Sequence, residues 1–382
     1  MRMAFCTPFK PLNHPRTSGD VTIAQDLFDY FAGHGHSPAT VPHLSTDWIW
    51  KQPARWPAYL RARSAVRRLC DSGNGLRPDL WFTYHSYYRA PDLFGPMARR
   101  MGIPYVIFAG AHSPGRRETW NTRPGYCLNV HALKTADHVF TNKQRDLTPL
   151  LSLLPENRIT FVPPGIRTER FSFNAEQRET LRAEWQAQGR TIVMTAAMLR
   201  PGVKAEGVEH VITACAALAR QGRDIMLVVA GDGTERERLE AMAGELLPSR
   251  SLFLGMVDRW NLYGAYSAAD LFAFPGINEG LGMVYLEAQC CGLPVVAWDH
   301  DGAPQMVEHG KTGFITPSYD GEAFARAIGL LADNRQTRTT MGEAARKHVL
   351  AHHDLNANYG MVEKRMFDML NTSSPATREN TR

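Results

Sequence analysis

The chain has 382 residues, a length that suggests two or three domains of ordinary size. Hydrophobic residues make up 44% and charged residues 21%, which excludes global disorder, and the absence of any stretch of about 18 apolar residues argues against a membrane-spanning helix. The net charge of +5 divides unevenly, because residues 1–171 hold 22 Lys and Arg against 12 Asp and Glu, a balance of +10, and the rest carries −5. The basic half favours an anionic or membrane-surface partner.

The first half of the chain alternates strand and helix patterns. Residues 1–15 lack the apolar core of a signal peptide and predict a first strand instead, which favours a cytoplasmic protein. An amphipathic run then predicts a helix that ends at Gly33–Gly35. Apolar, β-rich runs of buried-strand length follow at 80–86, 104–110, 138–142 and 159–165.

The second half repeats the alternation after a polar, helix-prone stretch at 173–189. Strand patterns lie at 191–198, 224–233, 251–255, 271–276 and 293–298. Helix patterns lie at 207–222, 320–333 and around 341–370. Such a succession is typical of doubly wound parallel sheets.

These patterns predict an α/β protein with two Rossmann-like, doubly wound domains that face each other across a cleft. The first domain is expected at 1–170 and the second at 171–370, with a last helix that can pack back on the first domain and a disordered tail at 371–382. Clefts at the carboxyl ends of parallel strands are the usual ligand sites. The six cysteines include no Cys-x-x-Cys pair and no cluster with zinc spacing, so no metal site is predicted.

The strongest local pattern is a strand, a glycine-containing loop and a helix at 271–292. Gly280 and Gly282 let a ligand approach the backbone closely, and the free N–H groups at the start of the helix favour an anion. Glu279 precedes this turn. Glu287 lies about one turn into the helix, four positions after Met283, where its carboxylate can accept hydrogen bonds from a diol such as ribose. On spacing alone, a surface glutamate beside a capping glutamate is the simpler interpretation.

Glu279 and Glu287, with seven residues between them, resemble the E-x7-E motif of retaining glycosyltransferases of family 4, which have the GT-B fold. The flanking sequence from 275 to 314 matches that family closely, and weaker similarity covers nearly the whole chain. The resemblance implies transfer of a sugar, with retention at the anomeric carbon, from a nucleotide-diphosphate donor.

The resemblance also implies roles for the motif residues. Glu279 is expected to hold sugar hydroxyls of the donor and Glu287 its ribose. The amides of the Gly-Leu-Gly turn are expected to contact phosphate or sugar, which assigns them to Gly280, Leu281 and Gly282.

A basic pair usually clamps the donor's diphosphate in that family, because two positive charges offset the negative charge that develops on the leaving group. Lys204 fits the family's lysine. Met198 or Leu199 stands where the family commonly has an arginine, and Arg200 is the candidate to reach in from a shifted loop. For Lys204 and Arg200 alike, a solvated loop charge is the alternative.

Three further positions are implied by the resemblance. His112 follows the strand predicted at 104–110, where a family histidine lies beside the transferring sugar, and a structural histidine is the alternative. Gly19 resembles the small residue that lets the backbone approach the diphosphate, with an ordinary turn before a helix as the alternative. Val257 lies in a segment that resembles the loop abutting the nucleobase.

Two basic segments suggest the acceptor side. Aromatic and basic residues are mixed at 48–68, which favours a membrane interface with anionic lipids, and a solvated helix face is the alternative. Arg116, Arg117 and Arg123 can bind an anionic acceptor such as a lipid diphosphate. No base-reading motif accompanies the charge, so a nucleic-acid partner is not predicted.

Together these features predict a retaining hexosyltransferase that uses a nucleotide-sugar donor and a glycan or lipid-linked acceptor, in cell-surface polysaccharide or glycolipid synthesis. It is expected in the cytoplasm, peripheral at the inner face of the membrane. No cofactor is expected besides the donor substrate, and no essential metal, because no DxD motif lies in a suitable loop. The alternatives are another GT-B activity, such as a sugar-nucleotide epimerase or a phosphorylase, and a non-catalytic sugar-nucleotide-binding protein.

Overall fold

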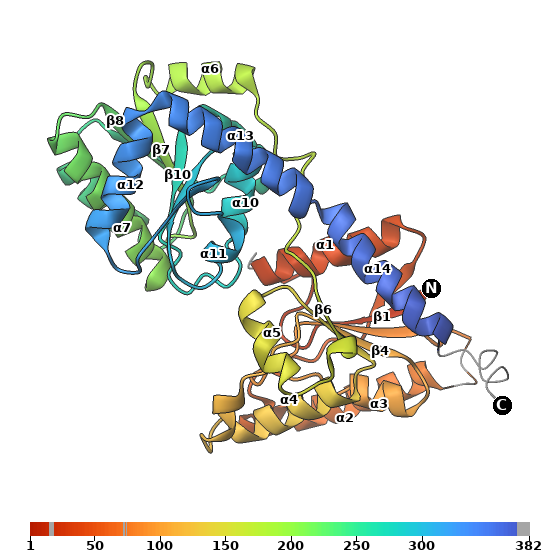
Figure 1. Cartoon of the computed structure of the whole chain (residues 1–382). Coiled ribbons are helices and arrows are strands. Elements are labelled where there is room, and N and C mark those ends of the chain that lie inside the picture. The colour runs from red at the N-terminus through yellow and green to blue at the C-terminus, as the bar shows by residue number, and fades with distance from the viewer. Residues whose placement is uncertain (15–18, 72, 74, 373–382) are drawn as a thin grey trace. The chain divides into compact units, whose positions relative to one another are not determined.

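The computed structural model describes residues 1–14, 19–71, 73 and 75–372, and the chain divides into two compact units (Figure 1). Unit 1 comprises Met1–Pro163 and Asn356–Arg382, and unit 2 comprises Pro164–Leu355. Unit 1 holds 24 Lys and Arg against 14 Asp and Glu, a charge of +10, and unit 2 holds 19 against 24, a charge of −5. Most of the predicted tail at 371–382 lies outside the described residues.

Unit 1 is built on a parallel sheet whose described strands run in the order β2-β1-β3-β4-β5-β6. Every residue of β3, β4 and β5 is buried, which is why these strands read as continuous apolar runs in the sequence. The elements of this part of the chain are β1 (Arg2–Cys6), α1 (Gly19–Gly33), β2 (Ser37–Thr40), η1 (Ile49–Lys51), η2 (Pro53–Arg55), α2 (Trp56–Cys70), β3 (Leu80–Tyr84), α3 (Gly95–Arg100), β4 (Tyr105–Phe108), η3 (Pro114–Arg117), α4 (Arg123–Thr135), β5 (His138–Thr141), α5 (Gln144–Leu151), η4 (Glu156–Arg158), β6 (Ile159–Phe161) and the last helix, α14 (Leu355–Thr372).

Helix α14 belongs to unit 1 although it follows unit 2 in the chain. Glu363 on this helix accepts hydrogen bonds from the Tyr30 hydroxyl at 3.0 Å and contacts the His36 ring at 2.7 Å. Tyr359 packs edge-on against Tyr30, with ring centroids 5.6 Å apart. These contacts attach α14 to α1 and to the segment that leads into β2.

Unit 2 has a parallel sheet with the described strands in the order β12-β11-β10-β7-β8-β9. Its core is the buried β7, β8, β10 and β11, covered by helices that include the largely buried α7 and α10. The elements are α6 (Ala175–Glu184), β7 (Thr191–Ala196), α7 (Val203–Arg220), β8 (Ile225–Ala230), α8 (Arg236–Leu246), β9 (Ser251–Gly255), η5 (Arg259–Asn261), α9 (Leu262–Ala268), β10 (Leu271–Ala273), α10 (Met283–Cys290), β11 (Val295–Trp298), α11 (Ala303–Met306), β12 (Gly313–Thr316), α12 (Gly321–Asp333) and α13 (Arg335–His352).

The predicted fold class is confirmed, because both units are α/β with wholly parallel sheets. The predicted helix end at Gly292 is also present: α10 closes at Cys291, and Gly292 follows with φ 82°, the left-handed conformation that glycine adopts without strain. The run predicted at 80–86 forms a strand only to Tyr84, because His85 has φ 64° and turns the chain out of the sheet. Among the described helices, none is long and apolar enough to cross a membrane.

Candidate functional site

The sheet of unit 2 reverses its strand order between β7 and β10, and a ligand crevice forms at such a switch point outside the carboxyl ends of the strands. The chain leaves β7 toward a loop that ends at Gly202, and α7 begins there with Lys204 in its first turn. It leaves β10 toward a loop that carries Glu279 and leads into α10. Two segments about 75 residues apart in sequence are therefore neighbours at one edge of the sheet.

At this edge the Lys204 ammonium forms an ion pair with Oε2 of Glu279. Both side chains are partly open to solvent, with 32% and 22% of their surfaces exposed. The ammonium also lies 5.5 Å from the centre of the Phe274 ring. The two residues that the sequence motifs single out thus meet, and their charged ends remain accessible to a ligand.

Arg200 lies close enough to influence Lys204. Burial, with the Arg200 guanidinium nearby, lowers the pKa of Lys204 to about 8. Arg200 is exposed, and no hydrogen bond or ion pair to its guanidinium is formed by any described residue. Leu199, one of the two residues that stand where the family commonly has an arginine, is fully buried. Two cations therefore converge here beside one carboxylate, an arrangement that attracts a multiply charged anion.

The loop between β10 and α10 has three residues with positive φ, namely Gly276 at 78°, Asn278 at 53° and Gly282 at 66°. A Cβ at Gly282 would lie 2.4 Å from the Tyr285 ring, so the ring's packing requires glycine there. Gly282 is the N-cap of α10 and provides no side chain to cap the helix. In the first turn of α10 the Tyr285 amide donates to the Gly282 carbonyl at 2.9 Å, and the two amides before it, of Met283 and Val284, are available to bind an anion next to the Lys204–Glu279 pair.

Glu287 is 4% exposed and lies one turn into α10. Its Oε1 accepts a hydrogen bond from Nε of Arg259 at 2.9 Å, and its Oε2 accepts one from the Tyr266 hydroxyl at 3.4 Å. Burial, with Glu287 nearby, raises the pKa of Tyr266 well above its usual value, so the phenol stays a donor. Arg259 comes from η5, just after β9, and sequence reasoning missed it because nothing local links it to a glutamate 28 positions later.

The segment after β9 approaches the same edge of the sheet. Gly255 ends this strand with φ 70°, and its carbonyl accepts a hydrogen bond from the Gly231 amide at 2.8 Å. Met256 is 65% exposed, and Val257 is half-buried. The loops after β8 and β9 therefore lie together at the carboxyl end of the sheet.

His112 lies in unit 1, after β4, and is 6% exposed. Its Nδ1 is 2.8 Å from the Pro149 carbonyl oxygen, which can only accept, so we assign the ring proton to Nδ1. Its Nε2 is then an acceptor and lies 3.2 Å from the Tyr126 hydroxyl. Both ring nitrogens are thus engaged with unit 1 residues.

Gly19 begins α1, and a Cβ built there would meet nothing within 4 Å, so neither space nor backbone conformation in unit 1 requires glycine.

The switch point of the unit 1 sheet lies between β1 and β3, and sequence reasoning missed the pair of side chains found there. Nδ1 of His85 is 3.6 Å from Oδ1 of Asp20. Burial lowers the pKa of His85 to about 4, although Asp20 opposes the change.

The arginines predicted to bind an anionic acceptor are exposed on unit 1. Arg116 and Arg117 belong to η3, and Arg123 starts α4. The Arg116 guanidinium lies over the Tyr88 ring, 4.8 Å from its centre. Across the described residues, no group of three His, Cys, Asp or Glu side chains has the arrangement of a metal site.

Comparison with known proteins gives concordant results. Residues 177–348 match the family described as Glycosyl transferases group 1. Over 269 residues the chain is 32% identical to a GDP-mannose-dependent alpha-(1-6)-phosphatidylinositol monomannoside mannosyltransferase of Mycolicibacterium smegmatis, an alignment that covers 68% of this chain and 69% of the relative. A D-inositol 3-phosphate glycosyltransferase of Corynebacterium jeikeium is 36% identical over 199 residues, covering 50% of this chain and 47% of the relative.

Solved structures show the same fold at low sequence identity. HepE of Anabaena in complex with UDP superposes with a TM-score of 0.76 at 18% identity, covering 96% of this chain and 100% of that one. A sucrose-phosphate synthase from Thermosynechococcus elongatus superposes with a TM-score of 0.72 at 18% identity, covering 96% and 99%.

Proposed function

The chain belongs to the glycosyl transferases of group 1, and from that premise we propose that it is a retaining hexosyltransferase that passes a sugar from a nucleotide-diphosphate donor to a lipid-linked acceptor. The observation that carries the proposal is the Lys204–Glu279 ion pair at the switch point of unit 2, beside Arg200 and the free amides that begin α10. These groups supply what a sugar diphosphate needs: cations and amides for phosphate, and a carboxylate for sugar hydroxyls.

On this proposal, binding of the donor breaks the Lys204–Glu279 ion pair and gives each residue a new partner on the donor. The diphosphate becomes the partner of the Lys204 ammonium, and the Glu279 carboxylate is released to accept hydrogen bonds from the sugar. Glu287 is held in place by Arg259 and Tyr266, and its carboxylate is the group that we propose as the acceptor for the ribose diol.

The proposed reaction breaks the bond between the anomeric carbon and the diphosphate oxygen and forms one to the acceptor oxygen on the same face of the sugar. The acceptor's proton goes to the departing diphosphate. Lys204, Arg200 and the α10 amides stabilise the negative charge that builds up on that leaving group, so their contribution is largest in the transition state.

The relatives' names support a finer proposal, in which GDP-mannose is the donor and an inositol phospholipid or a related lipid-linked glycan is the acceptor, in glycolipid or cell-surface polysaccharide synthesis. The chemistry of unit 1 agrees with a lipid acceptor. Its charge is +10, and one exposed face of α2 presents Trp56, Leu60, Arg63 and Arg67 at helical spacing. Apolar and basic side chains on one face suit an anionic membrane surface, so we propose a peripheral location at the cytoplasmic leaflet.

A donor panel tests the proposal. The full chain is incubated with GDP-mannose, UDP-glucose and ADP-glucose, each with and without an inositol phospholipid acceptor, and free nucleoside diphosphate and glycolipid are measured. Acceptor-dependent release from GDP-mannose, with an α-linked product from the α-linked donor, is expected. Conversion of the donor to another sugar nucleotide without acceptor would indicate an epimerase. Consumption of the donor only with inorganic phosphate would indicate a phosphorylase, and tight donor binding without turnover would indicate a binding protein. Each of these results would overturn the proposal.

A further inference from the structure

A second cavity, of about 640 Å³, lies in unit 2 at the edge of the sheet opposite the Lys204–Glu279 pair. It opens between α6 and α13, and its floor is formed where strands begin: Thr191 is the first residue of β7, and Asp270 and Leu293 lie just before β10 and β11. A strand of five or six residues spans roughly 17–20 Å, so this cavity and the candidate donor site are separate.

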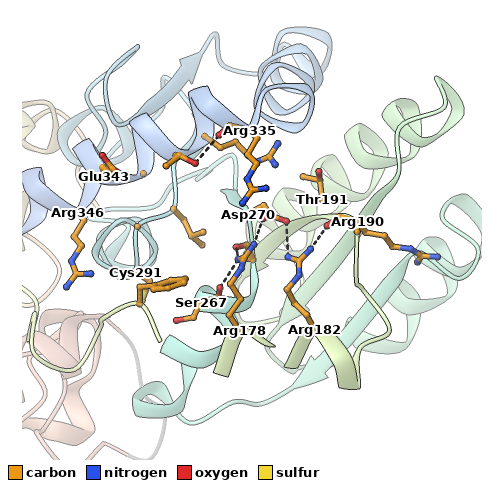
Figure 2. A pocket seen from close by; sticks show the side chains of 18 residues that line it. Arg178, Arg182, Arg190, Thr191, Ser267, Asp270, Cys291, Arg335, Glu343 and Arg346 are labelled. Atoms are coloured by element: carbon orange, nitrogen blue, oxygen red, sulfur yellow. Dashed lines mark hydrogen bonds and ion pairs between the residues drawn. The ribbon is translucent and has the colours of Figure 1, made fainter. Parts of the chain in front are cut away.

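The lining of this cavity is strongly basic. Six arginines line it, with Asp270 and Glu343 as the lining carboxylates, which gives the lining a formal charge of +4 in a unit whose overall charge is −5. Figure 2 shows the Arg190 side chain extending away from Asp270, and its Nε pairs with Asp224, outside the lining, at 3.5 Å. We call this cavity the arginine pocket, and its arginines are Arg178, Arg182, Arg190, Arg335, Arg338 and Arg346.

Two of the arginines have a structural role, and both form ion pairs with the Asp270 carboxylate. Figure 2 shows Arg178 and Arg182 side by side on α6, both directed at Asp270, with ion-pair distances of 2.7 and 3.0 Å. Burial acts to raise the pKa of Asp270, but the Ile192 amide and Arg178 outweigh it and hold that pKa below its usual value. Both guanidiniums also donate to backbone carbonyls near the start of β10, so they fasten α6 to the sheet.

Apart from Arg190, the remaining arginines of the pocket have no carboxylate in an ion pair with them among the described residues. Arg338 on α13 donates to the carbonyls of Leu331 and Ala332 at 2.6 and 2.7 Å, and these are neutral partners. Burial lowers its pKa despite Asp270, and the nearby Arg335 adds to the effect. Arg335 and Arg346 are exposed on the same helix, and within the described residues neither guanidinium has a hydrogen-bond or ion-pair partner.

We propose that the arginine pocket binds a phosphate-bearing ligand, either a soluble phosphomonoester or diphosphate or the headgroup of an anionic lipid. Planar guanidiniums bind phosphate oxygens in pairs, and several of them converge here from two helices. The cavity has the volume of a typical small-molecule site, which is about 300–1,000 Å³. Phe173 and Leu293 add an apolar wall for the part of the ligand that carries the phosphate.

The charge of this pocket is costly without a ligand. Its guanidiniums repel one another, since Arg335, Arg178 and Arg182 each act to lower the pKa of Arg338. Unit 2 already carries a net charge of −5, so its solubility does not require this cluster. Arg178 and Arg182 explain the attachment of α6, but Arg335 and Arg346 contribute no hydrogen bond or ion pair to the described fold. Asp270 neutralises only part of the positive charge of the lining. An anion bound between α6 and α13 would compensate the remainder.

Hydrogen–deuterium exchange of the full chain tests the proposal, with inorganic pyrophosphate as the soluble probe and phosphatidic acid in phosphatidylcholine vesicles as the lipid probe. The test variant is Arg335→Gln/Arg346→Gln, which removes two charges without removing a structural bond. The matched control is Arg326→Gln/Lys347→Gln, because Arg326 and Lys347 are exposed in unit 2 and do not line the pocket.

We expect slower exchange in peptides from α6 and α13 with at least one probe, and at least a tenfold weaker effect in the test variant only. Protection by pyrophosphate identifies a soluble ligand, and protection by phosphatidic acid vesicles alone identifies a lipid headgroup. Lys204→Ala weakens the candidate donor site and should leave this protection unchanged. Protection confined to the loops at 198–204 and 276–283, equal protection in the test variant, or no protection with either probe would overturn the proposal.

Discussion

Replacing Lys204 by alanine is the sharpest test of the proposed chemistry. The ammonium is one of two cations at the switch point, and it lies against Glu279 with about a third of its surface exposed. Removing one donor that stabilises a developing negative charge typically costs about 10²–10³ in kcat, or about 2.7–4 kcal/mol. Because Arg200 remains nearby, we expect Lys204→Ala to lower kcat by about 100-fold rather than abolish turnover.

The pH dependence gives this prediction a second signature. The pKa of Lys204 is lowered to about 8, so the charge that binds the diphosphate is lost as the pH rises through 8. The kcat/KM of the wild type, which reports the free enzyme, should therefore fall above pH 8, and Lys204→Arg should remove that fall. Unfolding of the protein cannot explain this fall in kcat/KM. Because the pKa of Lys204 in the folded protein lies below its unfolded value of 10.5, this residue makes the folded state more stable as the pH rises from 8 to 10.5.

The assay measures release of the nucleoside diphosphate with saturating acceptor from pH 6.5 to 9.5. Lys311→Ala is the control, because Lys311 is an exposed lysine of the same unit that pairs with Glu308 at 2.7 Å. A Lys204→Ala variant that keeps its fold and turns over within threefold of the wild type would refute the role of Lys204. A flat kcat/KM profile from pH 7 to 9 in the wild type would refute the pH argument.

Three other predictions address different parts of the molecule. Glu287→Gln keeps the shape of the side chain but weakens its bonds to Arg259 and to a ribose, so the Kd for nucleoside diphosphate should rise about tenfold in a calorimetric titration, and an unchanged Kd would contradict the ribose role. Burial lowers the pKa of His353 to about 4, so the stability that its neutral ring contributes above pH 6.5 is lost as the pH falls toward 4. Between pH 7 and 4.5, urea unfolding should show a decrease of about 2.5 kcal/mol in the free energy of unfolding that His353→Gln does not show. Equal decreases in the two proteins would contradict this role of His353. Trp56→Ala/Leu60→Ala should reduce co-sedimentation with anionic vesicles at least threefold without changing activity on a water-soluble acceptor, and undiminished binding would remove α2 from the membrane surface.

The sequence was sufficient where a feature depends on neighbouring residues. The glycine at 292 stops α10, and the apolar runs at 105–108 and 191–196 form strands covered on both faces, because backbone conformation and burial pattern are local properties. The edge strands β2 and β12 were not predicted. Each has only four residues, of which none is buried in β2 and two are buried in β12, so neither shows the continuous apolar run that marks a buried strand.

The candidate site was predictable only in part. Glu279 and Lys204 could be named from their motifs, but their pairing follows from the strand order, which places the ends of β7 and β10 side by side. Arg259 could not be named, because it reaches Glu287 from a loop that shows no motif. His85 was hidden within an expected strand, and only its positive φ takes it out of the sheet toward Asp20.

The amino-acid sequence by itself determined that this chain forms two α/β domains with a glycosyltransferase motif in the second, since periodicity, turn residues and a close run of motif residues are all properties of short segments. The tertiary structure alone decided which charges meet. It placed Lys204 against Glu279, and it gathered arginines from 178 to 346 into one basic pocket within an acidic unit. Electrostatic interactions depend on distance in space, and the folding of distant segments against one sheet sets those distances.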